Sequence, residues 1–413
     1  MKKVYFDNHS GSKLDQRVLD EMLPYLKDYY GNPQNMHTPG MKAREALDNT
    51  RHQVADLIGA KDEEVYFTSN GSEANNLAIK GLAEAYSSKG KHIIVSAIEH
   101  FSVLNAAKRL EQAGFEVTAL PVDKYGVVAA DDLKNAIKKE TILVSLQHAN
   151  PEIGTMQAIK ELTGITHQKG ALFHTDAICT VGTIPVSVTD LGVDALTLSG
   201  SQFHGPKGAA SLYLKKGIRV IPQIDGGIQE NGRRAGTENT PAIVGMGKAC
   251  EIAKAEMPEN NKKLLALRNR LISELPKKIE YLYLNGHPEQ RLINNVNFSV
   301  EFIEGEGMLL FLDEKNIYVS SGSACANKAL KMSHVLAAVK TDAAIAQGSV
   351  LMTLSKYNSD EDIDYMIAEF PAIVKKLREM SPLFAYFKKT GKRQEAGPGT
   401  DYEHQHDHET CDT

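Results

Sequence analysis

One cysteine of this chain stands among small residues, where a thiol would be easy to reach. Residues 320–325 read S-S-G-S-A-C and end in Cys325. Sulfur transfer needs a thiolate that both a donor and an acceptor can approach, and a loop of small residues favours that exposure. Free cysteines are more often buried and inert, so the alternative is a structural residue. The composition of the loop favours the exposed, reactive interpretation.

A second segment has the features of an anion-binding helix start. Residues 68–76 read T-S-N-G-S-E-A-N-N and follow the apolar run 65–68, which places Gly71 and Ser72 where a helix is expected to begin. Free backbone N–H groups and the positive end of the helix dipole meet at such a point, which favours a phosphate or carboxylate. Taken alone, the segment is more simply interpreted as a helix cap.

Polar side chains also follow three further apolar runs. His100 comes after residues 92–96, Asn150 after residues 141–145, and Asp176 after residues 172–175. In an open parallel sheet, catalytic groups gather in the loops beyond the carboxyl ends of the strands. Each residue also has a structural explanation: a hydrogen-bonded histidine, an asparagine in a turn and a helix-capping aspartate.

The elements that must position these residues alternate between short apolar strands and helical stretches. This pattern predicts a parallel sheet covered on both faces. From about residue 260 the pattern changes and indicates a smaller α+β domain, with a charged helix over 262–274, strands at 279–284 and 295–300, and a helix over 305–313. After about residue 390 the chain loses its periodicity, and we expect a disordered tail there.

The composition is that of an ordinary globular protein. The 413 residues are 42% hydrophobic and 24% charged, which is sufficient for two domains. The net charge of −5 gives no indication of nucleic-acid binding. A polar N-terminus and the lack of long apolar runs argue against a signal peptide and a membrane span. Four widely spaced cysteines form no disulfide framework, so we expect a cytoplasmic protein.

The order of these segments resembles the NifS/IscS-like cysteine desulfurases, which are class V aminotransferases of the pyridoxal-phosphate (PLP) fold type I. The resemblance covers roughly residues 3–375. It implies an α/β fold with a mostly parallel seven-stranded sheet in the large domain and a smaller α+β domain. The implied units are an N-terminal arm packing on the small domain (1–15), the large domain (16–262) and the small domain (263–388). A His-rich tail (389–413) follows them.

The resemblance also implies a set of residues around the cofactor. His100 would stack on the pyridine ring, Asn150 would contact the phenolic oxygen, and Asp176 would keep the ring nitrogen protonated, so that the ring can serve as an electron sink. Cys179 stands where the family usually has glutamine. The phosphate would be held by Gly71, Ser72 and Ser199 and, across a homodimer, by Thr237.

The chain departs from the family pattern at two positions on which the family chemistry depends. Residues 197–208 read T-L-S-G-S-Q-F-H-G-P-K-G, in which Gln202 takes the position of the lysine that bonds to the PLP aldehyde, and Ser201 that of a histidine. An amide cannot form an imine with an aldehyde. Leu351 takes the position of the arginine that pairs with the substrate carboxylate. Lys207 lies five residues beyond Gln202, in a corner that the family uses structurally.

Three functions follow from this combination. The first is a pseudoenzyme of sulfur or iron–sulfur cluster metabolism, in which Cys325 carries a persulfide or ligates a cluster while the protein docks an iron–sulfur scaffold or a sulfur-acceptor protein. The second is an enzyme of altered chemistry that binds PLP noncovalently. The third is a non-catalytic subunit that binds a metal or a partner through its tail.

The tail lies outside the resemblance and offers metal ligands of its own. Residues 402–411 read Y-E-H-Q-H-D-H-E-T-C. Alternating histidines followed by a cysteine could ligate Zn, Ni or Cu, through His404, His406, His408 and Cys411. The alternative is a solvated tail without a metal.

Overall fold

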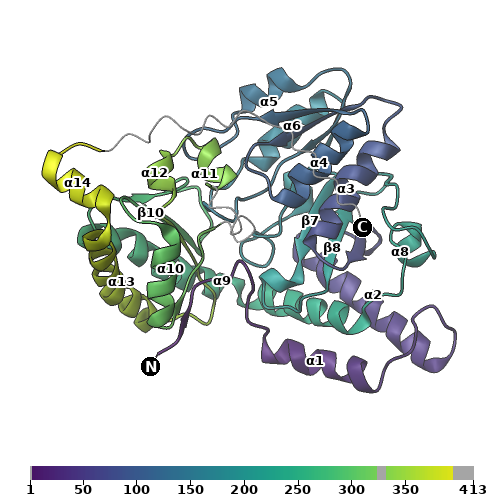
Figure 1. Ribbon diagram of the computed structural model, residues 1–413. Coiled ribbons are helices and arrows are strands. Elements are labelled where there is room, and N and C mark those ends of the chain that lie inside the picture. The colour runs from purple at the N-terminus through teal and green to yellow at the C-terminus, as the bar shows by residue number, and fades with distance from the viewer. Residues whose placement is uncertain (1, 323–331, 394–413) are drawn as a thin grey trace, which may run out of the picture.

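A seven-stranded sheet forms the larger part of the protein, whose computed structural model describes residues 2–322 and 332–393 (Figure 1). The strand order is β2-β8-β7-β6-β5-β3-β4. Neighbouring strands from β4 to β7 run parallel, whereas β8 is antiparallel to both β7 and β2. The expected mostly parallel sheet is therefore confirmed. Its strands are β2 (Val65–Thr68), β3 (His92–Ser96), β4 (Glu116–Leu120), β5 (Thr141–Ser145), β6 (Leu172–Asp176), β7 (Ala195–Ser199) and β8 (Ala210–Leu214).

Helices cover both faces of this sheet, which is why its central strands are continuous apolar runs. One face carries α1 (Gln16–Lys27), α2 (Thr38–Ile58), α6 (Ile159–Gln168) and the first part of α9 (Thr240–Lys278), which share one hydrophobic core with the sheet. The other face carries α3 (Gly71–Ala85) and α4 (Phe101–Gln112), which share a second core with it. The shorter helices of this part are α5 (Ala130–Ala136), α7 (Val188–Leu191) and α8 (Gln229–Gly232).

A smaller antiparallel sheet lies beside the large one (Figure 1). Its order is β12-β10-β9, formed by Ser349–Thr353, Asn295–Val300 and Leu282–Leu284. The strand expected over 295–300 is confirmed, and the one expected over 279–284 is confined to its second half. The helices of this part are α10 (Gly305–Glu314), α11 (His334–Ala338), α12 (Ala343–Ala346), α13 (Asp360–Met380) and α14 (Pro382–Thr390).

The N-terminal residues run along the smaller sheet. β1 (Val4–Tyr5) pairs in parallel with β11 (Ile317–Tyr318). Val4 and Phe6 are buried in the core of the small domain. The side-chain amide of Asn8 then donates a hydrogen bond to the carbonyl oxygen of Thr353 at 2.8 Å. The first residues of the chain therefore pack with its last strand.

α9 is 39 residues long and passes from one core into the other. Its residues between 242 and 253 pack under the large sheet, and those between 264 and 275 pack under the small one. A continuous helix thus replaces the separate one expected over 262–274. Pro258 removes one hydrogen bond of the helix, but apolar burial on both sides of it keeps the helix unbroken.

The structure shows no membrane-crossing helix in residues 2–322 and 332–393, because none of its helices there is both long and apolar enough.

Candidate functional site

A cavity of about 440 Å³ opens at the carboxyl ends of the parallel strands. His100 follows β3, Asn150 follows β5, and Asp176 and Ser199 end β6 and β7. The parallel sheet brings these four residues to one edge, as expected for an open α/β sheet. The residues singled out from the sequence that line this cavity are Gly71, Ser72, His100, Asn150, Asp176, Cys179, Ser199, Ser201, Gln202 and Leu351.

The start of α3 gives the cavity an anion site. The side chain of Asn70 caps the helix by accepting a hydrogen bond from the backbone N–H of Glu73 at 2.9 Å. The first N–H groups of the helix, those of Gly71 and Ser72, have no partner within the helix. These N–H groups and the positive helix end favour an anion.

Two serines add hydroxyl groups to this anion site. The side-chain oxygens of Ser199 and Ser201 lie 3.2 Å apart on the cavity. A Cβ atom at position 71 would lie only 2.2 Å from Cδ1 of Ile178, so the Ile178 side chain would have to shift to accommodate one. The arrangement offers N–H and O–H donors of the kind that bind a phosphate.

Asp176 contributes a carboxylate that is buried beside the cavity. Its Oδ1 accepts a hydrogen bond from the N–H of Ile178 at 3.0 Å, and its Oδ2 accepts one from the side chain of Asn75 at 2.7 Å. Burial raises the pKa of Asp176, while these hydrogen bonds and nearby His100 act in the opposite direction. A cationic group beside Asp176 would therefore favour its ionised form.

Gln202 lies in a short helical turn, η2 (Gly200–Gln202), that the N-terminal arm holds in place. Its Nε2 donates to the carbonyl oxygen of His9 at 3.0 Å. The hydroxyl of Ser12 donates to the carbonyl oxygen of Ser201 at 2.6 Å and accepts from the N–H of His204 at 3.1 Å. His204 has a φ of +68°, a left-handed conformation that residues other than glycine rarely adopt. The arm thus fixes the loop that carries Gln202.

His9 and Cys179 form a neutral pair on the same cavity. The sulfur atom of Cys179 lies 3.7 Å from Nδ1 of His9. Burial, assisted by His100, lowers the pKa of His9 to about 4. Burial also raises the pKa of the Cys179 thiol well above its usual value. Cys179 is therefore a weak nucleophile near neutral pH, because the thiolate is the reactive form.

His100 and Asn150 combine a place on the cavity with a structural role. Nδ1 of His100 caps α4 by accepting from the N–H of Ser102 at 3.1 Å. The side chain of Asn150 donates to the carbonyl oxygen of Ile98 at 3.0 Å and accepts from the N–H of Glu152 at 2.9 Å. The predicted contacts of His100 and Asn150 with a cofactor ring remain predictions.

Two further carboxyl groups belong to the lining. Oε1 of Glu99 accepts from the N–H of Gln147 at 3.0 Å, and Oε2 of Glu152 accepts from the hydroxyl of Ser333 at 2.7 Å. Burial raises the pKa of Glu99 to about 8 and that of Glu152 to about 7. Both groups hold their protons over a wider pH range than exposed glutamates.

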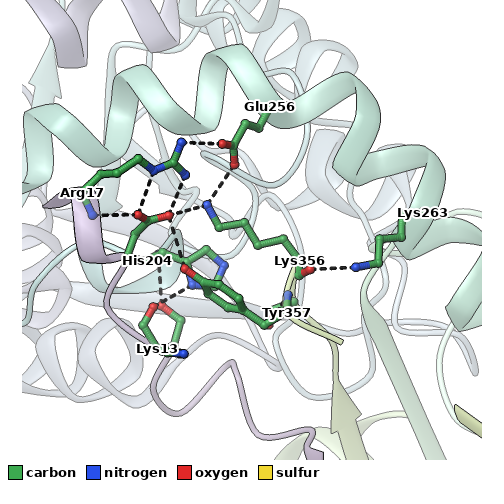
Figure 2. A network of polar contacts seen from close by, with 10 residues as sticks. Lys13, Arg17, His204, Glu256, Lys263, Lys356 and Tyr357 are labelled. Atoms are coloured by element: carbon green, nitrogen blue, oxygen red, sulfur yellow. Dashed lines mark hydrogen bonds and ion pairs between the residues drawn. The ribbon is translucent and has the colours of Figure 1, made fainter. Parts of the chain in front are cut away.

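A cluster of charged side chains joins the N-terminal arm, α9 and the end of β12 (Figure 2). Lys356, which follows β12, lies 2.7 Å from Asp15 and 2.9 Å from Glu256. Arg17 contacts the same two carboxylates, at 2.8 and 2.7 Å. Hydrogen bonds from Arg17 and then from Lys356 hold the pKa of Asp15 far below its usual range. The cluster thereby positions the strand that carries Leu351 against the arm.

Comparisons with known proteins show the family in which this arrangement occurs. The pattern of the family described as aminotransferase class-V matches residues 4–366. The chain belongs to the class-V aminotransferase family. A "Cysteine desulfurase IscS" of Methanosarcina thermophila is 50% identical over 382 residues, which cover 92% of this chain and 94% of that protein. The IscS of Dictyoglomus turgidum is 48% identical over 381 residues, which cover 92% and 97%.

A solved structure supports the same assignment. A NifS-like protein superposes on this class-V aminotransferase with a TM-score of 0.86 at 37% identity, covering 91% of this chain and 100% of that one. The resemblance to NifS/IscS-like cysteine desulfurases and the PLP fold type I expected from the sequence are therefore confirmed.

The cavity of this class-V aminotransferase fits PLP, the cofactor of the family, except at one point. The start of α3 with Ser199 and Ser201 fits the phosphate, and Asp176, oriented by Asn75, fits the ring nitrogen. The disagreement concerns the covalent bond: in the described part of the chain the cavity lining contains no lysine. Lys207 is exposed and does not belong to that lining.

Several predicted residues lie elsewhere. Thr237 is exposed and does not line the cavity, so its contact with a second subunit stays a prediction. In residues 2–322 and 332–393 no group of three or more His, Cys, Asp or Glu side chains is placed to hold a metal ion. The predicted sulfur carrier and tail ligands lie outside the described residues; they are Cys325, His404, His406, His408 and Cys411.

Several residues of the site are not singled out from the sequence, among them His9, Asn75 and Glu99. Asn75 could have been found, because it lies four residues after Gly71 and thus on the same face of the helix. Glu99 follows a strand in the same way as His100, but its complete burial has no signal in the sequence. His9 comes from the arm, for which only packing was expected.

Proposed function

We propose that this chain is a cysteine desulfurase homologue of sulfur or iron–sulfur cluster metabolism that forms no covalent bond to PLP. The names of its relatives support the metabolic setting. The observation that carries the proposal is Gln202, whose amide is held against His9 in a cavity with no lysine in its described lining. A positioned acid–base group contributes about 10²–10⁴-fold to a rate, and the amide of Gln202 cannot act as one.

The cavity residues would still bind and orient the cofactor. The N–H groups of Gly71 and Ser72 and the hydroxyls of Ser199 and Ser201 would hold its phosphate, and Asp176 would keep a proton on its ring nitrogen. Bound in this way, PLP would supply an electron sink. Turnover of L-cysteine by the lysine-dependent route of the family would be very slow or absent.

Cys325 is the proposed sulfur carrier or cluster ligand, with an iron–sulfur scaffold or sulfur-acceptor protein as partner. Gly322, the last described residue before it, lines the cavity. As a carrier, the Cys325 thiolate would take the outer sulfur of a persulfide donor, whose inner sulfur leaves as a thiolate. This step needs neither PLP nor the missing lysine.

Borohydride reduction tests the absence of a covalent bond. The purified full-length chain is mixed with PLP, its visible spectrum is recorded, and its intact mass is measured before and after reduction. We expect no covalently added phosphopyridoxyl group. A phosphopyridoxyl group fixed to any side chain would overturn the proposal.

Persulfide labelling tests the role of Cys325. The chain is incubated with glutathione persulfide, and bound sulfane sulfur is quantified in the wild type, Cys325→Ser and Cys179→Ser. We expect labelling to be lost in the first variant and kept in the second, because the raised pKa of the Cys179 thiol keeps it protonated. Equal labelling of all three proteins would remove Cys325 as the carrier.

The N–H and hydroxyl donors grouped at the cavity favour a second candidate, an enzyme of altered chemistry that binds PLP noncovalently. Ser199, Ser201 and Asp176 remain grouped at one cavity although the lysine is absent. Titration with PLP tests this candidate, since the absence of a bound chromophore would exclude it.

We further propose that the protein is a cytoplasmic homodimer. A homodimer would offer cover for the large apolar side chains of Met36, Tyr30 and Ile228, which are 93%, 83% and 82% exposed. Cys179 and Cys250 are free thiols, as is usual in a reducing compartment. Light scattering of the purified chain would test the dimer, and a monomeric mass would contradict it.

A further inference from the structure

The cavity has no strong cation in the described part of the chain. Neither lysine nor arginine belongs to the lining that residues 2–322 and 332–393 supply. Its titratable side chains are instead carboxyl groups, imidazoles and one thiol. They are Glu99, Glu152, Asp176, His9, His100, His334 and Cys179.

Leu351 occupies this lining with a fixed, apolar side chain. It is only 2% exposed and pairs with Asn297 in the middle of the small sheet. Its N–H donates to the carbonyl oxygen of Ser320 at 2.7 Å, and the N–H of Ser320 donates back to its carbonyl oxygen at 3.1 Å. Both hydrogen bonds go to Ser320, and Asn297 of β10 is the pairing partner on the other side. Because this backbone is held between two neighbours, the apolar group cannot easily move aside for a polar one.

The buried cations near the cavity are committed to other partners. The guanidinium of Arg291 donates to the carbonyl oxygens of Asn285 and Ile153 and to the side chain of Asn295, at 3.0–3.3 Å. Lys356 lies between Asp15 and Glu256. Neither side chain is available to replace the missing arginine.

We propose that this cavity binds a ligand without a carboxylate, namely a small uncharged or cationic amine or thiol whose apolar end lies against Leu351. The inference rests on the proposed function, because it takes the cavity to hold both cofactor and substrate. It names a substrate class that differs from the amino acid implied by the family resemblance.

The physical reason is the cost of an unpaired charge. A carboxylate that enters the cavity gives up water and finds neither guanidinium nor ammonium among the described lining residues, which is strongly unfavourable. The carboxyl groups of Glu99, Glu152 and Asp176 add repulsion wherever they are ionised. An ammonium group meets the opposite situation, because a cation favours the ionised form of the carboxyl groups beside it and is then attracted to them.

Two stable conjugates that differ only by a carboxylate provide the test. N-phosphopyridoxyl-L-alanine and N-phosphopyridoxyl-ethylamine have the same ring, phosphate and chain length, and neither contains an aldehyde. Their Kd values for the full-length chain are measured by calorimetry, with pyridoxamine 5′-phosphate as the reference ligand. We expect the ethylamine conjugate to bind about tenfold tighter or more, because the carboxylate lacks a charged partner.

Matched variants assign the preference to position 351. We expect Leu351→Arg to raise the affinity for the alanine conjugate at least about tenfold, because it adds a charge-assisted pair. Leu351→Met should keep the wild-type preference. Leu310→Arg adds the same charge at a 69% exposed position of α10 and should change neither affinity.

The outcomes separate this inference from the proposed function. If the reference ligand binds and the alanine conjugate is equal or tighter in the wild type, the inference is overturned while the proposed cofactor site stands. If the reference ligand does not bind, the cofactor site itself is refuted and the inference fails with it. The comparison on the unaltered chain does not depend on the folding of any variant.

Discussion

Nε2 of Gln202 and the backbone carbonyl oxygen of His9 are 3.0 Å apart and share a hydrogen bond. The contact uses the Gln202 amide to attach the N-terminal arm to the loop after β7. The position that the family resemblance assigns to the cofactor-bonding lysine is thus, in this chain, a contact between two of its own segments. The functional proposals above depend on this replacement.

The first prediction is that Gln202→Lys restores covalent capture of PLP. The new amine can bond to the aldehyde, so borohydride should fix one phosphopyridoxyl group per chain, measured by intact mass. The lost hydrogen bond to His9 should lower the free energy of unfolding by about 1 kcal/mol. Turnover of L-cysteine should stay low because Leu351 cannot bind its carboxylate. Lys207→Gln, at an exposed position, serves as the control. Introduced into the wild type or into Gln202→Lys, it should not change the amount of phosphopyridoxyl group that borohydride fixes.

The second prediction concerns the charge beside the ring. Asp176→Asn keeps the shape of the side chain but removes its charge, and it should weaken pyridoxamine 5′-phosphate binding about tenfold or more, measured by calorimetry. The same exchange at the exposed Asp190 of α7 is the control. Unchanged affinity in Asp176→Asn would mean that this carboxylate does not face the ligand.

The third prediction is a pH dependence set by Glu99. Its pKa is about 8 in the folded protein and 4.5 as the ordinary value, so the folded state keeps a proton that the unfolded state releases between these pH values. Its contribution therefore makes the free energy of unfolding fall as pH rises through this window, by up to about 1.4 kcal/mol per pH unit. Glu99→Gln should remove that slope.

Urea unfolding at several pH values measures the slope. Glu111→Gln changes an exposed glutamate of α4 and is the matched control. If Glu99→Gln and the wild type show parallel pH profiles, Glu99 does not hold its proton in the folded protein.

The fourth prediction concerns the charged cluster of Figure 2. Asp15→Asn removes a carboxylate that both Arg17 and Lys356 contact and should lower the free energy of unfolding by about 2 kcal/mol near neutral pH. Because the pKa of Asp15 is depressed in the folded state, its stabilisation is present above 3.8 and is lost as pH falls further. The difference in free energy of unfolding between Asp15→Asn and the wild type should therefore become smaller as the pH falls below 3.8.

Thermal or urea unfolding of Asp20→Asn provides the comparison for this fourth case. Asp20 lies on the exposed face of α1, so its exchange should change stability by less than about 0.5 kcal/mol. Equal effects of the two substitutions would show that the cluster contributes nothing specific.

Much of the fold could be predicted from the sequence, because burial on both faces leaves a local signal. The run 141–145 is a strand whose residues are all buried, and a helix is expected and found after it. The polar residues at the ends of such strands met at one cavity because parallel strands place their carboxyl ends together. Asp176 and Ser199 were therefore predictable as neighbours.

Long-range polar contacts could not be predicted in the same way. Asp15 and Lys356 are separated by 341 residues. Aspartate and lysine are both common on protein surfaces, so neither residue type indicates a partner so far away in the sequence. The hydrogen bond between Gln202 and His9 likewise spans 193 residues. The continuity of α9 through Pro258 could not be predicted, because it depends on tertiary burial on both sides of that proline.

The continuity of α9 has a consequence for how the molecule comes apart. Leu271 and Met246 lie on the same helix but belong to different hydrophobic cores, so each sheet buries one half of α9. Removing either sheet would expose the apolar side chains of α9 that this sheet covers. We therefore expect the two parts to unfold cooperatively, although their sheets share no strand.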